Sequence, residues 1–144
     1  MLRRWKSVNL EAEIPKIIQN SSDEMVRLNR EQLYVRGERS DNERLAPYRS
    51  ITYALEKNNI NPSPGLFNPD LYLTGDFQGG FYAQVKSGKS VSFGSTDFKS
   101  DRLERDYGKE IFGLTFDNKK VYLDTSIMPG IRSYITRQTG VKFG

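Results

Sequence analysis

The sequence predicts a mixed α+β fold in which helices pack on a small antiparallel β-sheet. Three observations lead to this class: apolar residues at helical spacing near both ends, strict alternation in two neighbouring segments of the middle, and a turn-forming linker between those segments. The 144 residues suit one domain, residues 1–144, which buries about 68–70% of its unfolded surface.

The N-terminal third predicts a long helix with one narrow apolar face. The positions on that face are Ile14, Ile17, Ile18, Met25 and Leu28, with Ser21 continuing it. Because proline is tolerated only in the first turn of a helix, Pro15 places the start of the main helix near Ile14, after a kinked turn from Asn9. The helix should end around Tyr34 to Val35, where Gly37 supplies a left-handed stop.

Two long connections follow, with a short helix between them. Residues 37–47 are charged and lack periodicity, and residues 58–70 contain three prolines and a glycine. The helix spans about Tyr48 to Lys57, and Ile51, Ala54 and Leu55 share one side of it. Residues before proline avoid the helical region, so residues 58–70 are extended or turning. Such long connections are uncommon in compact domains, and we expect both to be loops or arms used in assembly.

The middle of the chain predicts the sheet. Leu71 and Leu73 alternate with polar residues before a turn at residues 74–76. Residues 81–86 (FYAQVK) alternate strictly, and residues 90–95 (SVSFGS) do so through Val91 and Phe93. The linker 87–89 (SGK) makes these two segments a tight hairpin.

The C-terminal third predicts helices that pack on this sheet. A short helix over about residues 97–107 should bury Leu103 and Tyr107 and end at Gly108. After an apolar patch at residues 111–114, Asp117 should cap a final helical region. Pro129 and Gly130 should break or kink that region and give two pieces at about 117–127 and 129–138, with Gly140 closing the second. Its apolar positions are Val121, Leu123, Ile127, Ile131, Tyr134 and Ile135.

The composition excludes several kinds of chemistry. The chain has no cysteine and no histidine, so it lacks disulfides, Cys/His zinc sites, thiol nucleophiles and histidine bases. Residues 87–90 (SGKS) match the end of a phosphate-binding Walker loop, but that loop needs a glycine where Ala83 stands, and a strand lies on either side. Gly75, Gly79 and Gly80 do not form a dinucleotide fingerprint. We therefore expect no catalytic residue, no cofactor and no metal.

The formal net charge of +4 comes from an excess of basic residues at the two ends of the chain. Arg3, Arg4 and Lys6 precede the first acid, and Arg132, Arg137 and Lys142 follow the last acid. Basic ends contact phosphate, an acidic protein surface or a neighbouring subunit, or they are simply solvated termini. No stretch of the chain approaches 18 apolar residues, so we expect no membrane contact.

The order of short motifs resembles the tail-completion or virion-morphogenesis (neck) proteins of tailed bacteriophages. The matching positions are Pro47, Tyr53 and Lys57, then Leu71, Thr74 and Gly75, then Tyr82 and Ala83, and finally Phe112, Gly113 and Leu114. Residues 61–65 (NPSPG), 69–77 (PDLYLTGDF) and 133–140 (SYITRQTG) are similar to versions from phages of gut Bacteroidetes, including crAss-like podoviruses. The sequence departs from the family at Phe77, where leucine is usual, and at residues 87–90, where a Glu-x-Gly is missing.

The resemblance implies a structural virion protein assembled in the bacterial host cytoplasm. Such a protein forms a ring of six or twelve copies between the portal and the tail, where it contacts portal or adaptor and tail or neck proteins. It lines or seals the DNA channel. The basic ends are then candidates for unspecific contact with packaged DNA or for contact with an acidic partner.

Two other functions remain open on the sequence alone. The first is a small nucleic-acid-binding accessory protein, in which Phe81, Tyr82 and Phe93 stack bases near Lys86 and Lys89. The second is a small hydrolase that uses carboxylates, for which the candidates are Asp101, Glu104, Asp106 and Glu110. Basic residues alternate with these acids, which is typical of a solvated helix, and we expect no concave pocket that gathers several acids.

Overall fold

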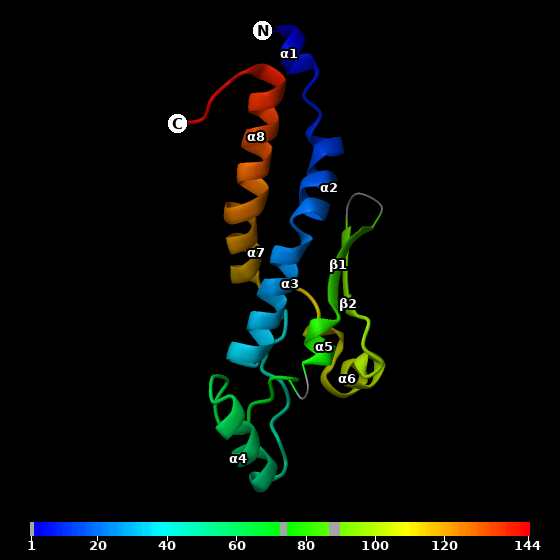
Figure 1. Ribbon diagram of the computed structural model, residues 1–144, viewed down its shortest axis with the longest axis vertical. Coiled ribbons are helices and arrows are strands. Elements are labelled where there is room, and N and C mark those ends of the chain that lie inside the picture. Colours follow the sequence, from blue (N-terminus) through cyan, green and yellow to red (C-terminus); the bar gives the residue numbers. More distant parts are fainter. Residues whose placement is uncertain (1, 73–74, 87–89) are drawn as a thin grey trace.

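A computed structural model describes residues 2–72, 75–86 and 90–144, with the side chains of residues 2 and 3 left out. The fold is mixed α+β, as predicted: a two-stranded antiparallel hairpin and a long bent C-terminal helix both pack on the N-terminal helices. The molecule is elongated, with α4 at one end and the two chain termini at the other (Figure 1). In chain order the described elements are α1 (Leu2–Lys6), α2 (Leu10–Asn20), α3 (Ser22–Glu31), η1 (Gln32–Arg36), α4 (Ile51–Ile60), α5 (Asp76–Gly79), β1 (Phe81–Lys86), β2 (Ser90–Ser95), α6 (Ser100–Tyr107), η2 (Lys109–Ile111), α7 (Phe116–Tyr122), η3 (Leu123–Ile127) and α8 (Met128–Thr139).

The N-terminal helix is divided where the sequence predicted one continuous segment. α2 begins at Leu10, earlier than predicted, because the Asn9 side chain caps it by accepting the N–H of Ala12 at 3.2 Å. Pro15 lies inside α2 and removes only one intrahelical hydrogen bond. The bend falls at Ser21, whose hydroxyl donates to the Ile17 carbonyl at 2.7 Å and lies 2.5 Å from the Tyr122 hydroxyl.

The end of this helical region follows the prediction. α3 continues into the π-helical turn η1, and Gly37 then ends it in the left-handed conformation, with φ 62°. A Cβ atom at this position would lie 2.8 Å from the Pro69 carbonyl oxygen, so the close approach of residues 64–69 also requires glycine.

The hairpin agrees with the prediction in its bounds and its faces. β1 pairs with β2 from Phe81 opposite Ser95 to Lys86 opposite Ser90, and Phe81 and Ala83 are buried. The predicted linker, residues 87–89, lies outside the described residues. Leu71 belongs to no strand, contrary to the alternation read from the sequence, and Leu73 lies outside the described residues. The Leu71 φ angle is 58°, because the Asp70 carboxylate accepts the N–H of Tyr72 at 2.9 Å and turns the chain.

The C-terminal helical region is long and bent but continuous, so the predicted break or kink at Pro129 and Gly130 does not divide it into two separate pieces. α7, η3 and α8 follow one another directly, and Thr115, not Asp117, caps the first turn by accepting the N–H of Asn118 at 3.2 Å. The π-helical turn η3 precedes the proline, and such a wider turn relieves the clash between a proline ring and the preceding turn of helix. α8 lies so close to α2 at Gly130 that an added Cβ atom would stand 2.6 Å from the Ile17 side chain. The absence of a side chain at Gly130 therefore permits this close packing. Gly140 ends α8 as predicted.

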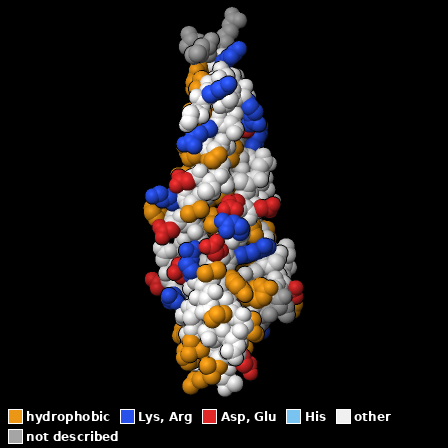
Figure 2. Space-filling model, turned by 60° about the vertical axis from the view of Figure 1, so that its left-hand side comes forward, with side chains coloured by type: hydrophobic (Ala, Val, Ile, Leu, Met, Phe, Trp, Pro, Cys, Tyr) orange, Lys and Arg blue, Asp and Glu red, His pale blue; other side chains and the backbone are white. Residues whose placement is uncertain are grey.

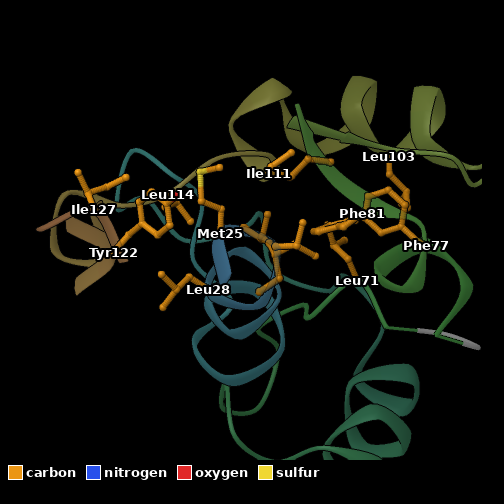
Figure 3. Packing of buried hydrophobic residues seen from close by; sticks show 14 of the residues in the cluster. Met25, Leu28, Leu71, Phe77, Phe81, Leu103, Ile111, Leu114, Tyr122 and Ile127 are labelled. Carbon is orange, nitrogen blue, oxygen red and sulfur yellow. The ribbon is translucent and has the colours of Figure 1, made fainter. Parts of the chain in front are cut away.

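The hydrophobic core runs along α3 between the hairpin and the C-terminal helix. In Figure 3, Phe77, Phe81 and Leu103 gather on one side, Tyr122, Leu114 and Ile127 gather on the other, and Met25 and Ile111 lie between the two groups. Four predicted apolar positions, Val121, Leu123, Ile51 and Leu55, are exposed.

Candidate functional site

The six basic residues predicted as contacts lie at one end of the molecule. α1 packs on α8, so the two chain termini meet although they are more than a hundred residues apart (Figure 1). Residues 1–13 and 128–144, here called the basic end, carry six Lys/Arg and two Asp/Glu, whereas residues 14–127 carry 16 of each. The whole formal net charge of +4 therefore belongs to the basic end.

Hydrogen bonds to α8 hold the N-terminal segment in place. The Tyr134 hydroxyl accepts the N–H of Asn9 at 2.9 Å and donates to the Ser7 carbonyl at 3.2 Å. The Arg4 guanidinium donates to the Thr139 carbonyl at 3.4 Å, near the C-terminus of the helix. A cation at a helix C-terminus is also favoured by the helix dipole. Arg4 thus helps to join the two termini, while the Arg3 side chain lies outside the described residues.

Two arginines of the basic end line an open cavity beside α8. The cavity measures about 520 Å³, and its walls are Pro129, Arg132, Ser133, Thr136, Arg137 and Phe143. Arg132 is exposed, and the Arg137 guanidinium lies 3.5 Å from the Glu13 carboxylate. Guanidinium groups bind phosphate and carboxylate oxygens with paired hydrogen bonds. The cavity therefore suits a phosphate group or an acidic side chain, and Lys6 and Lys142 are exposed at the same end.

The opposite end of the molecule exposes apolar side chains, which the sequence analysis missed. Ile51 is 65% exposed and Ile60 69%, and Leu55 and Leu66 are exposed beside them. These four residues, here called the apolar end, belong to α4 and the loop after it, where Figure 2 shows orange side chains gathered at the tip of the molecule. Gathered apolar side chains indicate a contact surface, whereas scattered ones do not.

Ile51 and Leu55, which the sequence pattern places on one side of the helix with Ala54, do not face the core. Only Ala54 is buried, and the other buried residue of α4 is Lys57, three positions later. α4 thus docks through a small side chain and a charged one, which leaves its larger apolar residues outside. The sequence contained an indication of this exposed surface. The apolar residues of α4 lie on more than one side of the helix, whereas a helix that buries one face has its apolar residues on that face alone.

Several positions of the phage-family motifs meet in a small pocket between α4 and α6. Tyr53, Lys57, Leu71 and Phe77 line this cavity of about 160 Å³, together with Tyr48, Tyr72, Lys99, Arg102, Leu103, Asp106 and Tyr107. Burial raises the pKa values of the Tyr48 and Tyr107 hydroxyls above the ordinary tyrosine value. Both phenols are therefore neutral hydrogen-bonding groups at physiological pH.

A buried ion pair forms the floor of this region. The Lys57 ammonium lies 2.9 Å from the Asp70 carboxylate and also donates to the Tyr72 carbonyl. The second carboxylate oxygen accepts from the Asn61 amide at 3.0 Å, and that amide also donates to the Tyr34 carbonyl at 2.6 Å. The network joins α4 to the Pro-rich connection and to η1, so the motif residue Lys57 has a structural role.

The Phe112–Leu114 motif is held by amide side chains of the N-terminal helix. Asn29 donates to the Ile111 carbonyl at 2.9 Å and accepts the N–H of Gly113 at 3.1 Å. Gln32 donates to the Gly113 carbonyl at 3.0 Å and accepts from Thr115 and Asn118 at 2.9 and 2.8 Å. The Phe112 ring then packs against Phe77 and Phe81. This irregular segment is buried because side chains satisfy its backbone groups.

The remaining motif positions lie in different surroundings. Gly75 adopts a left-handed φ of 88°, and Ala83 is buried in the core. Tyr82 lies across Gly94 of the neighbouring strand, where a Cβ atom would stand 2.5 Å from its hydroxyl oxygen. Pro47 is exposed, and Thr74 lies outside the described residues. The motif positions are therefore spread between the α4 pocket, the hairpin and the 111–114 segment.

The structure corrects one expectation about acids. Asp101, Glu104 and Glu110 line a cavity of about 470 Å³ beside β2, together with Lys109, where we expected no concave pocket that gathers several acids. Among the described residues, no group of three or more acidic side chains is arranged to hold a metal ion.

The aromatic hairpin offers little surface for stacking bases. Phe81 faces the core, Phe93 is half-buried, and Tyr82 is exposed on the outer face with Lys86. Lys89 lies outside the described residues.

Comparison with models of protein families, with curated proteins and with solved structures found no match. Within the ranges that the structure describes, no helix has both the length and the apolar character needed to cross a membrane.

Proposed function

We propose that this chain is a structural virion protein of a tailed bacteriophage, assembled in the host cytoplasm. It forms a ring of six or twelve copies in the head–tail connector or neck, joins the portal to the tail, and lines or seals the DNA channel. The observation that carries the proposal is the separation of the basic end from the apolar end on an elongated subunit, visible in Figure 2. The order of the family motifs agrees with it.

A connector subunit needs two different surfaces, because its neighbours along the channel axis differ. The apolar end supplies side chains that gain free energy when a protein partner covers them, at about 25 cal/mol per Å² of apolar surface. The basic end supplies exposed guanidinium and ammonium groups, which attract DNA phosphates or an acidic protein without reading base sequence. We assign portal or adaptor and tail or neck proteins as the partners of these two surfaces.

The test is made on particles of the phage that encodes the chain. Mass spectrometry and cryo-imaging of purified virions should find the chain in a multiple of six copies. Ile51→Ser/Leu55→Ser and Arg132→Gln/Arg137→Gln should fold like the wild type but enter particles poorly. Lys16→Gln/Lys120→Gln, which removes two exposed charges outside the basic end, is the matched control. A chain that is absent from virions would refute the proposal.

The alternative function, a nucleic-acid-binding accessory protein, is favoured by the arginine-lined cavity of the basic end. It predicts that the free protein binds DNA at physiological salt in a filter-binding assay. A plot of the logarithm of the binding constant against the logarithm of the salt concentration should have a slope of about −0.9 for each phosphate that the protein neutralises. Arg132→Gln/Arg137→Gln removes two cations and should therefore reduce the magnitude of that slope by about two. Strong binding of this kind by the free monomer would favour the accessory role over the structural one.

A further inference from the structure

The outer edge of β2 is an unpaired sheet edge. The Thr96 N–H donates to the Gly80 carbonyl at 3.0 Å, so these two residues form a hydrogen-bonded pair of the antiparallel ladder. Because hydrogen-bonded pairs alternate along the strands, the N–H and C=O groups of Val91, Phe93 and Ser95 point away from β1. The equivalent edge of β1 is covered, since the Val85 N–H donates to the Gln19 side chain of α2 at 3.3 Å. Among the described residues, none accepts a hydrogen bond from the N–H of Val91 or Phe93.

A groove follows this edge. Two cavities, of about 470 and 360 Å³, share Ser40, Val91 and Phe93 in their walls. The second has an apolar floor of Met25, Leu114 and Tyr122, and the first is lined by the acids of α6 and η2 with Lys109. β2 itself carries no charge, no proline and no bulge, which are the usual protections of an edge strand. The edge is therefore suited to accept another strand.

The chain contains a segment with the matching pattern. Residues 141–144 (VKFG) follow Gly140 and form an irregular tail beside α8 (Figure 1), in which the Val141 backbone is hydrogen-bonded to the side chains of Thr136 and Thr139 and Phe143 lines the cavity of the basic end. Val141 and Phe143 alternate with Lys142, and Phe143 is 49% exposed. In an extended conformation the two apolar side chains share one face and the lysine takes the other.

We propose that residues 141–144 of one copy add as a third strand to β2 of a second copy. Val141 and Phe143 then lie on the side of Val91 and Phe93, over the apolar floor of the groove, and Lys142 faces Asp101, Glu104 and Glu110. The tail and β2 lie on opposite sides of the α2–α8 pair, so the contact runs head to tail between copies (Figure 1). A head-to-tail contact closes into a ring when the rotation fits, and the inference thus rests on the proposed ring assembly and names its contact.

Complementary variants of the full chain test the contact by sedimentation and native mass spectrometry. Val141→Asp/Phe143→Asp removes both apolar side chains of the tail, leaves its backbone hydrogen bonds to Thr136 and Thr139 possible, and should abolish self-association. Val91→Pro removes an N–H that makes no bond to β1, and should weaken self-association about 2- to 12-fold. Val91→Thr, which keeps that N–H, and Lys142→Arg, which keeps the charge, are the controls. A mixture of the tail and edge variants should form mainly one-to-one dimers, because the intact tail of the edge variant binds the intact edge of the tail variant more tightly than it binds the damaged edge of another copy.

A charge exchange tests the orientation of the added strand. Lys142→Glu and Glu104→Lys should each weaken self-association about 1.5- to 5-fold, and the double variant should recover the loss. Hydrogen exchange read by NMR should show protection of the Val91 and Phe93 amides only in associated wild-type protein. It should show the same protection when the peptide of residues 138–144 is added to the tail variant.

The results separate this inference from the proposed function. If the tail variant associates like the wild type, or if the peptide leaves the Val91 and Phe93 amides unprotected, the strand contact is refuted, whether or not the chain is found in virions. If the strand contact is found but virions lack the chain, the virion role fails and the self-association stands.

Discussion

The buried ion pair between Lys57 and Asp70 offers the sharpest test of the fold. Lys57→Met keeps most of the aliphatic length of the side chain but removes the ammonium group. The Asp70 carboxylate, which is 2% exposed as a residue, then keeps the Asn61 amide and the Tyr72 N–H as its partners among the described residues. The Tyr72 carbonyl also loses a donor. A charge that was paired in a dry region is left without its counter-ion.

The expected cost is large for one substitution. Removing one member of a buried ion pair costs about 3–5 kcal/mol, against a total unfolding free energy of about 5–15 kcal/mol for a domain. For a chain of this size, that loss corresponds to a fall of about 6–20 °C in Tm. Asp70→Asn should cost a similar amount, because it leaves the lysine uncompensated. The double variant should be no worse than either single one, since it buries no lone charge.

Urea unfolding followed by far-ultraviolet circular dichroism measures these changes in the free energy of unfolding. Lys16→Met is the matched control: Lys16 is 71% exposed in its side chain and lies 4.0 Å from Glu13, so its loss should cost at most about 0.5 kcal/mol. If Lys57→Met cost less than 1 kcal/mol, the pair would be solvated, and the docking of α4 described above would be wrong.

Three further predictions concern particular backbone and side-chain contacts. Gln32→Leu leaves the Gly113 carbonyl and the Thr115 N–H without partners and should lower the free energy of unfolding by about 2–6 kcal/mol in the same assay. Gly37→Ala should cost about 1–2 kcal/mol or more, because φ is positive and the added Cβ meets a backbone oxygen, whereas Gly79→Ala has open space and should change Tm little. The raised pKa of the Tyr48 hydroxyl means that the folded chain keeps a proton that the unfolded chain loses above about pH 10. The free energy of unfolding should therefore fall as pH rises above 10, and Tyr48→Phe should flatten that fall in an alkaline titration.

The elements with a regular sequence pattern were predictable. β1 and β2 were found with their bounds because alternation over six residues has no competing interpretation when a short linker follows. Gly37, Gly108 and Gly140 marked the ends of helical segments because a left-handed or extended stop favours glycine at positive φ. The excess of basic residues at the two chain ends was also visible in the sequence. That the two ends meet in a single surface was not.

The errors occurred where a contact distant in sequence overrides the local pattern. Leu71 and Leu73 alternate like a strand, yet the Asp70 carboxylate, held by Lys57, turns the chain at that point. Pro129 was expected to break or kink the helix and divide it into two pieces, but a π-helical turn precedes it and the bent helix continues from α7 into α8 while packing on α2. Ile51 and Leu55 share one side of the predicted helix with Ala54, yet both are exposed, because α4 docks through Ala54 and Lys57.

The sequence by itself determined the α+β class, the hairpin, the absence of cysteine and histidine chemistry, and the excess of basic residues at both ends, because each depends on residue types or on short-range spacing. The tertiary structure decided where those features lie relative to one another. It placed both basic termini at one end, the uncovered apolar residues of α4 at the other, and an unpaired strand edge beside an acidic groove. Surfaces of this kind arise from packing between residues distant in the chain, and no local pattern encodes which face of an element remains uncovered.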